Sequence, residues 1–198
     1  MKKFKNKYRT QSQRKPGWNY SSEAFYFLTL VTQNRACNLS KITDGKTNLL
    51  DFGKIIEKEW FKSFEIRKEL FLHAFVIMPN HLHCIVEINK SNDEKTQVVV
   101  DTNLSEYPID NIFSIKRNKP IRLPKSISSF IAGFKSATNN KIDNFIDEQN
   151  LAIPKYNRKN HFFQPDYHDH IIRNDGEFIR ISNYIQQNPK NWEKDKLK

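Results

Sequence analysis

The segment 81–88 constrains the fold more than any other part of the chain, because its side chains alternate in character from end to end. The apolar positions are Leu82, Cys84, Val86 and Ile88, and the positions between them are His81, His83, Ile85 and Glu87. Successive side chains of a β-strand point to opposite faces of its sheet. The alternation therefore predicts a strand that packs by one apolar face and carries two histidines on the other face.

Other segments supply further strands and helices. Residues 25–31 and 72–78 are rich in aromatic and β-branched types, which is typical of buried strands. Three segments have apolar residues at steps of three and four and are predicted helices: 49–64, about 126–145, and 174–188. Asn174 followed by Glu177 predicts a capping box, and Pro189 ends the third helix. Trp60 is expected in the core.

The charge of the chain favours a polyanionic partner. The 198 residues contain 33 Lys and Arg against 22 Asp and Glu, a net charge of +11. Such a field attracts polyanions, and nucleic acid is the commonest partner of a small basic domain. A basic protein without any nucleic-acid role is the alternative.

The length predicts one domain with additions at its ends. Residues 1–20 form a basic arm in which aromatic and cationic side chains alternate, a mixture suited to phosphate contacts and base stacking; a solvated tail is the alternative. Residues 21–192 are the predicted domain, and residues 89–123 within it are a predicted insertion. A loop of that length inside a compact domain is usually functional or disordered. Within it, 98–100 could form a short strand. Residues 193–198 are a basic tail.

Several features predict a cytoplasmic protein with no membrane contact. Cys37 and Cys84 form no paired motif, so reduced cysteines are expected. The basic N-terminus has no apolar segment behind it, as a secretory signal would require. No apolar run approaches the roughly 20 residues needed to cross a bilayer.

The two histidines of segment 81–88 are candidate metal ligands. Residues two apart on a strand share a face and lie about 6–7 Å apart, so the imidazoles of His81 and His83 can converge on one ion. Many folds contain this spacing, so a structural role for both histidines remains open.

Tyr184 and Asn188 form the second candidate pair. Residues four apart on a helix are neighbours, so these side chains should project together. A phenol can attack a phosphodiester, although its pKa near 10 makes it a poor nucleophile unless a metal polarises the phosphate. The amide oxygen of Asn188 could be a third metal ligand. A core tyrosine and a helix-ending asparagine are the alternative reading.

Taken in order, several motifs resemble those of the single-tyrosine HUH transposases, and among these the REP-associated tyrosine transposases. The motifs are residues 14–20, 75–83, 129–136, 164–173 and 184–189. The resemblance covers most of residues 14–192 apart from the insertion. It departs from the family at Phe163-Gln164-Pro165, where an aromatic-Gln-Arg segment is common.

The resemblance implies an α+β fold, with a ferredoxin-like central antiparallel sheet and helices packed on it. It implies that His81, His83 and Asn188 bind Mg²⁺ or Mn²⁺, and that Tyr184 attacks DNA to leave a 5′-phosphotyrosine and a free 3′-OH. Single-stranded, hairpin or palindromic DNA is the implied substrate. The predicted DNA-binding residues are Arg14, Lys15, Lys135 and Arg173. Relatives include monomers and homodimers, so either state is possible.

Three alternatives stay open. Tyr167 is a competing nucleophile beside His168 and His170, and these histidines with Asp169 could instead support the metal ligands from outside. The chain could be a catalytically silent module that recognises hairpin DNA. It could also be a metal-dependent hydrolase of small phosphoesters.

Overall fold

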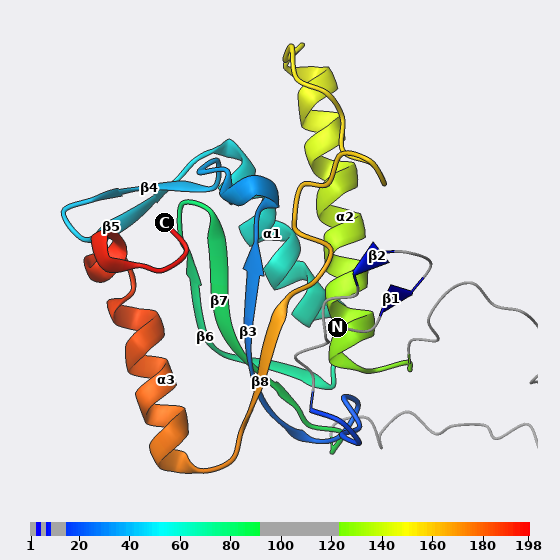
Figure 1. The fold of residues 1–198 in the computed structure, drawn as a ribbon, viewed down its shortest axis with the longest axis vertical. Helices are drawn as coiled ribbons and strands as arrows, with labels where there is room; N and C mark the ends of the chain where they lie inside the picture. Colours follow the sequence, from blue (N-terminus) through cyan, green and yellow to red (C-terminus); the bar gives the residue numbers. More distant parts are fainter. Residues whose placement is uncertain (1–2, 5–6, 9–14, 92–122) are drawn as a thin grey trace, which may run out of the picture.

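The computed structural model describes residues 3–4, 7–8, 15–91 and 123–198, and its centre is a four-stranded antiparallel sheet of order β6-β7-β3-β8 (Figure 1). The strands are β3 (Ala24–Val31), β6 (Leu70–Ile77), β7 (His81–Ile88) and β8 (His168–Ile172). The helices are α1 (Asp51–Ile66), α2 (Ile127–Glu148) and α3 (Asp175–Gln187). Smaller elements are β1 (Lys3–Phe4), β2 (Lys7–Tyr8), β4 (Ser40–Thr43), β5 (Lys46–Leu49) and the 3₁₀ turns η1 (Gln33–Arg35) and η3 (Pro189–Lys194).

The order β3-α1-β6-β7-α2-β8 is the βαββαβ arrangement of ferredoxin-like folds. The predicted α+β class with a ferredoxin-like antiparallel sheet is therefore confirmed. Strand β7 begins and ends at the predicted residues, and β3, β6 and the three helices lie within a few residues of their predicted positions.

Helices α1 and α2 cover one face of the sheet. The apolar side chains of β3 and β7 on this face are fully buried against them, as alternation predicts. Trp60 of α1 is fully buried, stacks on Phe75 at 5.3 Å between ring centroids, and meets Phe134 of α2 edge-on at 4.8 Å. Its predicted place in the core is confirmed.

Helix α3 covers the opposite face, which carries the two histidines. Ile181 and Ile185 of α3 pack there on Ile85 of β7 and Ile172 of β8. The interpretation that the strand packs only by its other side was wrong, because the apolar stripe of α3 needs a partner and this face provides it. His81 and His83 consequently lie inside the molecule, 0% and 3% exposed.

Helix α3, which carries Tyr184, starts at a cap formed by Asn174. The Oδ1 atom of Asn174 accepts a hydrogen bond from the backbone N–H of Glu177 at 2.9 Å, as predicted for an N-cap. The Glu177 carboxylate, however, accepts from the backbone N–H of Arg173 at 3.0 Å rather than from Asn174. The second hydrogen bond of the predicted capping box therefore uses the N–H of Arg173, one residue before the expected Asn174.

Several predictions fall on residues outside those described. They concern Arg14, the strand at 98–100 and nearly all of the insertion at 89–123. In the N-terminal arm, β1 and β2 pair antiparallel. Among the described residues, no helix combines the length and apolar character that crossing a membrane demands.

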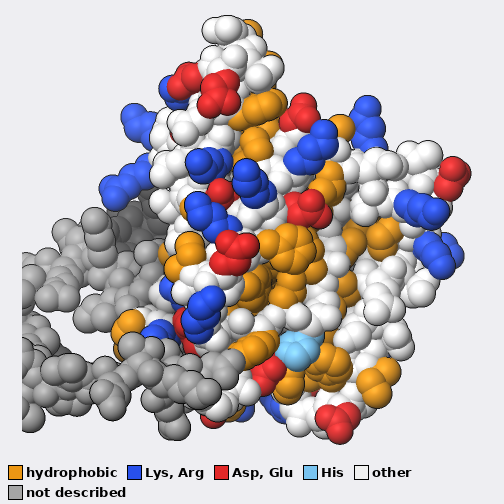
Figure 2. Space-filling model, turned by 180° about the vertical axis from the view of Figure 1, so that it is seen from behind, with side chains coloured by type: hydrophobic (Ala, Val, Ile, Leu, Met, Phe, Trp, Pro, Cys, Tyr) orange, Lys and Arg blue, Asp and Glu red, His pale blue; other side chains and the backbone are white. Residues whose placement is uncertain are grey.

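On one face of the molecule, the described basic side chains are not gathered in one place (Figure 2). Figure 2 shows the face opposite to that of Figure 1, where Lys and Arg side chains are scattered over the upper part with acidic side chains between them. This face of the described chain therefore offers no single continuous basic groove.

Candidate metal and tyrosine site

His81 and His83 open strand β7, in the middle of the sheet. Their strand partners on β3 are Val31 and Thr29. The two imidazole rings lie 4.5 Å apart between centroids, so the predicted convergence of the pair is possible in this fold.

The ring of His81 is held in one tautomer. Its Nδ1 atom lies 2.7 Å from Oδ1 of Asn80, and Nδ2 of Asn80 donates to the carbonyl oxygen of Leu197 at 2.7 Å. Because the amide N–H faces Leu197, the amide oxygen faces His81 and must accept a hydrogen bond from Nδ1–H. The Nε2 atom of His81 is left with a lone pair, and it is buried without a hydrogen-bond partner.

Burial keeps both imidazoles neutral. It lowers the pKa of His81 to about 4, against a smaller opposing effect of the Asp195 carboxylate. Burial also lowers the pKa of His83 well below its ordinary value, and the neighbouring His81 and His168 lower it further. Neutral imidazole is the form that binds metal ions.

His83 connects the strand to the predicted nucleophile. Its Nδ1 atom lies 2.8 Å from Oγ1 of Thr29, and its Nε2 atom lies 3.2 Å from the phenol oxygen of Tyr184. When Nδ1–H donates to Thr29, Nε2 accepts from the phenol. Thr29 therefore orients His83 much as Asn80 orients His81.

Tyr184 and Asn188 lie together on one side of α3, at the end nearer the histidines. The Tyr184 side chain is 46% exposed, so a substrate can reach it. Its pKa is raised, first by burial and then by Asp195, while a hydrogen bond with Asn188 opposes the rise. Asn188 is 3% exposed, and its Oδ1 atom has no hydrogen-bond partner.

Asp195 was missed by the sequence analysis. Its Oδ2 atom lies 3.7 Å from Nε2 of His81, and its side chain is 5% exposed. One ligand atom from each of His81, His83 and Asp195 lies within 4.8 Å of the others. The only signal was an acid among lysines near the end of the sequence, and no periodicity predicts that this segment folds back over β7.

These residues fit a divalent ion. A buried imidazole nitrogen and a buried amide oxygen lack partners, on His81 and Asn188 respectively, and a cation would satisfy both. Carboxylate and amide oxygens suit Mg²⁺ and Mn²⁺, and imidazole nitrogen also binds transition metals.

Two of the predicted DNA-binding residues, Lys15 and Arg173, are exposed. Lys15 is exposed, with Nζ 5.0 Å from the centre of the Trp18 ring. Arg173 is exposed just before α3, at the opposite end from Asn188. Neither is joined to the histidine site in the described chain, and DNA binding by these residues remains a prediction.

Lys135 lies in a polar socket. Its ammonium donates to the carbonyl oxygens of Gln164, Pro165 and Asp166 at 2.6, 3.2 and 3.3 Å. Burial lowers the pKa of Lys135 to about 8, and the Asp166 carboxylate opposes this shift. The contacts made here hold the segment before β8 on helix α2, and a phosphate contact remains a prediction.

The competing nucleophile lies in this socket rather than at the histidine pair. Tyr167 is half-buried, and Nζ of Lys135 lies 5.9 Å from the centre of its ring. Nε2 of His170 pairs with Oε1 of Glu177 at 2.8 Å. His168 lies on the same sheet face as His83, since both pair with Thr29, and Asp169 is buried. Tyr184, by contrast, contacts His83 directly.

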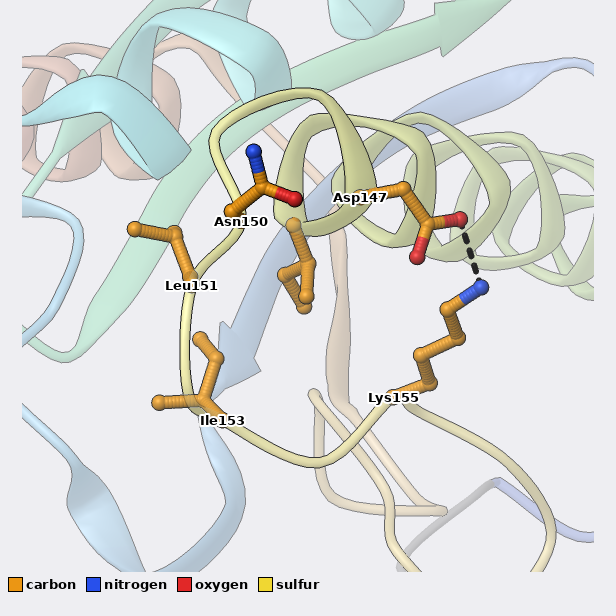
Figure 3. Close-up of a pocket in the computed structure, with 6 residues that line it drawn as sticks. Asp147, Asn150, Leu151, Ile153 and Lys155 are labelled. Atoms are coloured by element: carbon orange, nitrogen blue, oxygen red, sulfur yellow. Dashed lines mark hydrogen bonds and ion pairs between the residues drawn. The ribbon is translucent and has the colours of Figure 1, made fainter.

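A separate pocket lies at the C-terminal end of α2 (Figure 3). Leu151 and Ile153 line it, and an ion pair of 2.5 Å joins Lys155 to Asp147 at its edge. It contains none of the predicted site residues.

Comparison with known proteins supports the fold. No family model matches the chain. A Haemophilus influenzae protein described only as uncharacterized is 28% identical over 191 residues, which span 94% of this chain and 92% of that protein. The structure of a REP-associated tyrosine transposase bound to a REP hairpin matches 92% of this chain and 74% of its own, with a TM-score of 0.52 and 16% identity. The chain has the fold of that transposase, so the predicted resemblance is confirmed at the level of fold.

Proposed function

We propose that this chain is a metal-dependent endonuclease and strand transferase for single-stranded DNA, with Tyr184 as nucleophile. Hairpin or palindromic DNA is the proposed substrate, which agrees with the REP hairpin bound by the transposase of the same fold. Mg²⁺ or Mn²⁺ is the proposed cofactor, held by His81, His83 and Asn188.

One observation carries the proposal. The phenol oxygen of Tyr184 lies 3.2 Å from Nε2 of His83, although the two residues are 101 positions apart in sequence. Beside this contact, the buried Nε2 of His81 and Oδ1 of Asn188 have no hydrogen-bond partner, and such buried polar atoms are destabilising unless a ligand satisfies them. A phenol beside such atoms is the arrangement that a tyrosine nucleophile needs.

The proposed reaction is a transesterification. The Tyr184 oxygen forms a bond to phosphorus, the bond from phosphorus to the 3′ oxygen breaks, the phenol proton is released, and the 3′ oxygen leaves as a hydroxyl after taking up a proton. A bound divalent ion would polarise the scissile phosphate and stabilise its developing charge. The amide of Asn188 favours the ionised phenol by hydrogen bonding to it. Attack of a 3′-OH on the phosphotyrosine reverses the step and joins a new strand.

The test is a covalent adduct assay. Labelled hairpin DNA from the flanks of the gene is incubated with Mn²⁺ and the protein, then run on a denaturing gel. We expect a shifted, protease-sensitive band that is lost in Tyr184→Phe and His81→Ala. Tyr167→Phe is the matched control and should keep the band, because Tyr167 contacts Lys135 instead of the histidines.

An adduct that persists in Tyr184→Phe would refute Tyr184 as nucleophile. Tight, salt-sensitive hairpin binding with no adduct under any condition would instead support the catalytically silent binding module. Turnover of a small phosphodiester without competition from DNA would support the hydrolase.

A further inference from the structure

We propose that Asp195 is a metal ligand of this site and supplies its only anionic donor among the described residues. The inference rests on the proposed function, since it concerns the same ion. It adds a carboxylate from the C-terminal segment 189–198 to the histidine pair and the amide of Asn188.

The first argument is that two hydrogen-bond acceptors face each other, one on His81 and one on Asp195. Asn80 places the ring proton of His81 on Nδ1, so Nε2 has none to donate. This bare nitrogen nevertheless faces a carboxylate oxygen of Asp195 at 3.7 Å, in a buried setting. Two acceptors that face one another repel, and a cation between them turns the repulsion into attraction.

The second argument is distance. Ligand atoms lie about 2.1 Å from Mg²⁺ and at similar distances from other small divalent ions, so two donors to one octahedral ion lie roughly 3.0 to 4.2 Å apart. The separation of 3.7 Å between His81 and Asp195 falls inside this range. The widest separation in the cluster, within 4.8 Å, needs a small inward movement.

The third argument is that Asp195 is held in place. Its Oδ1 atom accepts from the backbone N–H of Leu197 at 2.7 Å, which leaves Oδ2 directed at His81. The carbonyl oxygens of Lys196 and Leu197 accept from Arg35 and Asn80 at 3.2 and 2.7 Å. Trp192, nearly buried, lies 6.2 Å from the His81 ring between centroids. The segment is thus fastened on both sides of the carboxylate.

An ordinary ion pair between Asp195 and His81 explains the geometry less well. It would require a proton on Nε2, while the hydrogen bond to the amide oxygen of Asn80 already requires the ring proton on Nδ1. Both ring nitrogens would then carry protons, and the separation of 3.7 Å between Nε2 and Oδ2 would still be longer than a direct hydrogen bond.

The experiment measures Mn²⁺ affinity directly, by the loss of the electron paramagnetic resonance signal of free Mn²⁺ on titration with the full chain, without DNA. The variants are Asp195→Asn, His81→Ala and the matched control Glu193→Gln. Asn keeps the size of Asp195 and the acceptor for Leu197, and removes the charge. Glu193 lies in the same segment, is 79% exposed and pairs with Lys198.

We expect Asp195→Asn to weaken Mn²⁺ binding at least tenfold, His81→Ala to weaken it further, and Glu193→Gln to leave it unchanged. Circular dichroism and thermal melting verify that each variant is folded. If folded Asp195→Asn bound Mn²⁺ with wild-type affinity while His81→Ala lost affinity, the inference would be overturned but the proposed metal site would be supported. Wild-type affinity in folded His81→Ala would overturn the proposed metal site itself. An equal loss in Glu193→Gln would overturn the inference, because it would show that Mn²⁺ affinity depends only on the total charge of the protein.

Discussion

At the scale of single residues, Asn80 has two roles, because its one amide orients His81 and also holds the C-terminal segment. We expect Asn80→Ala to lower Mn²⁺ affinity about 10- to 100-fold, the usual effect of removing the group that orients a metal-binding histidine. Calorimetric titration measures it. Asn89→Ala, just past the other end of β7, is the matched control, and an equal loss there would contradict the prediction.

Tyr184 determines the pH dependence of the proposed reaction. Burial, the largest effect on its phenol, raises the pKa of Tyr184 above the ordinary value, so the ionised fraction at neutral pH is small. Below that pKa the phenolate fraction rises tenfold for each pH unit. We therefore expect single-turnover adduct formation to rise steadily between about pH 6 and about pH 8 without levelling. A plateau beginning below pH 7 would mean that phenol ionisation is not limiting.

At the scale of elements, the cap of α3 stabilises the start of the helix that carries Tyr184. Asn174→Ala removes the hydrogen bond to the Glu177 N–H and should cost about 1 kcal/mol of unfolding free energy. Urea unfolding measures the loss, and the adduct rate should fall as well. Gln186→Ala, at an exposed position of the same helix, should change neither by much. Equal losses in both variants would show that the cap has no special role.

Patterns in the sequence predicted most of the elements but only part of the site. The alternation in β7, and the apolar residues at steps of three and four in the helices, show which side chains are buried. Burial can be predicted in this way because it depends on the type of each residue and on local geometry. The spacing of His81 to His83 and of Tyr184 to Asn188 placed each pair on one face for the same reason. The path of the C-terminal segment follows from single hydrogen bonds of Arg35 and Asn80, and such contacts leave no period in the sequence.

At the scale of the whole molecule, stability depends on the aromatic cluster between α1, α2 and the sheet. Trp60→Ala should cost about 3–5 kcal/mol of unfolding free energy, because a fully buried indole leaves a cavity among Phe75, Phe130 and Phe134. The measurement is urea unfolding followed by circular dichroism. Phe61→Ala, at a position 47% exposed on the same helix, should cost much less. Similar costs would place the core elsewhere.

The site is divided between two parts of the chain. His81 and His83 precede residues 92–122, whereas Tyr184, Asn188 and Asp195 follow them. Strands β3, β6 and β7 come from the first part, and α2, β8 and α3 come from the second. If the parts were made as separate polypeptides, each would contain half of the proposed site, and under the proposed function neither should cut a strand alone. Cleavage would then depend on the two fragments binding to each other, so the proposed function predicts a conditional nuclease that is switched on by bringing two fragments together.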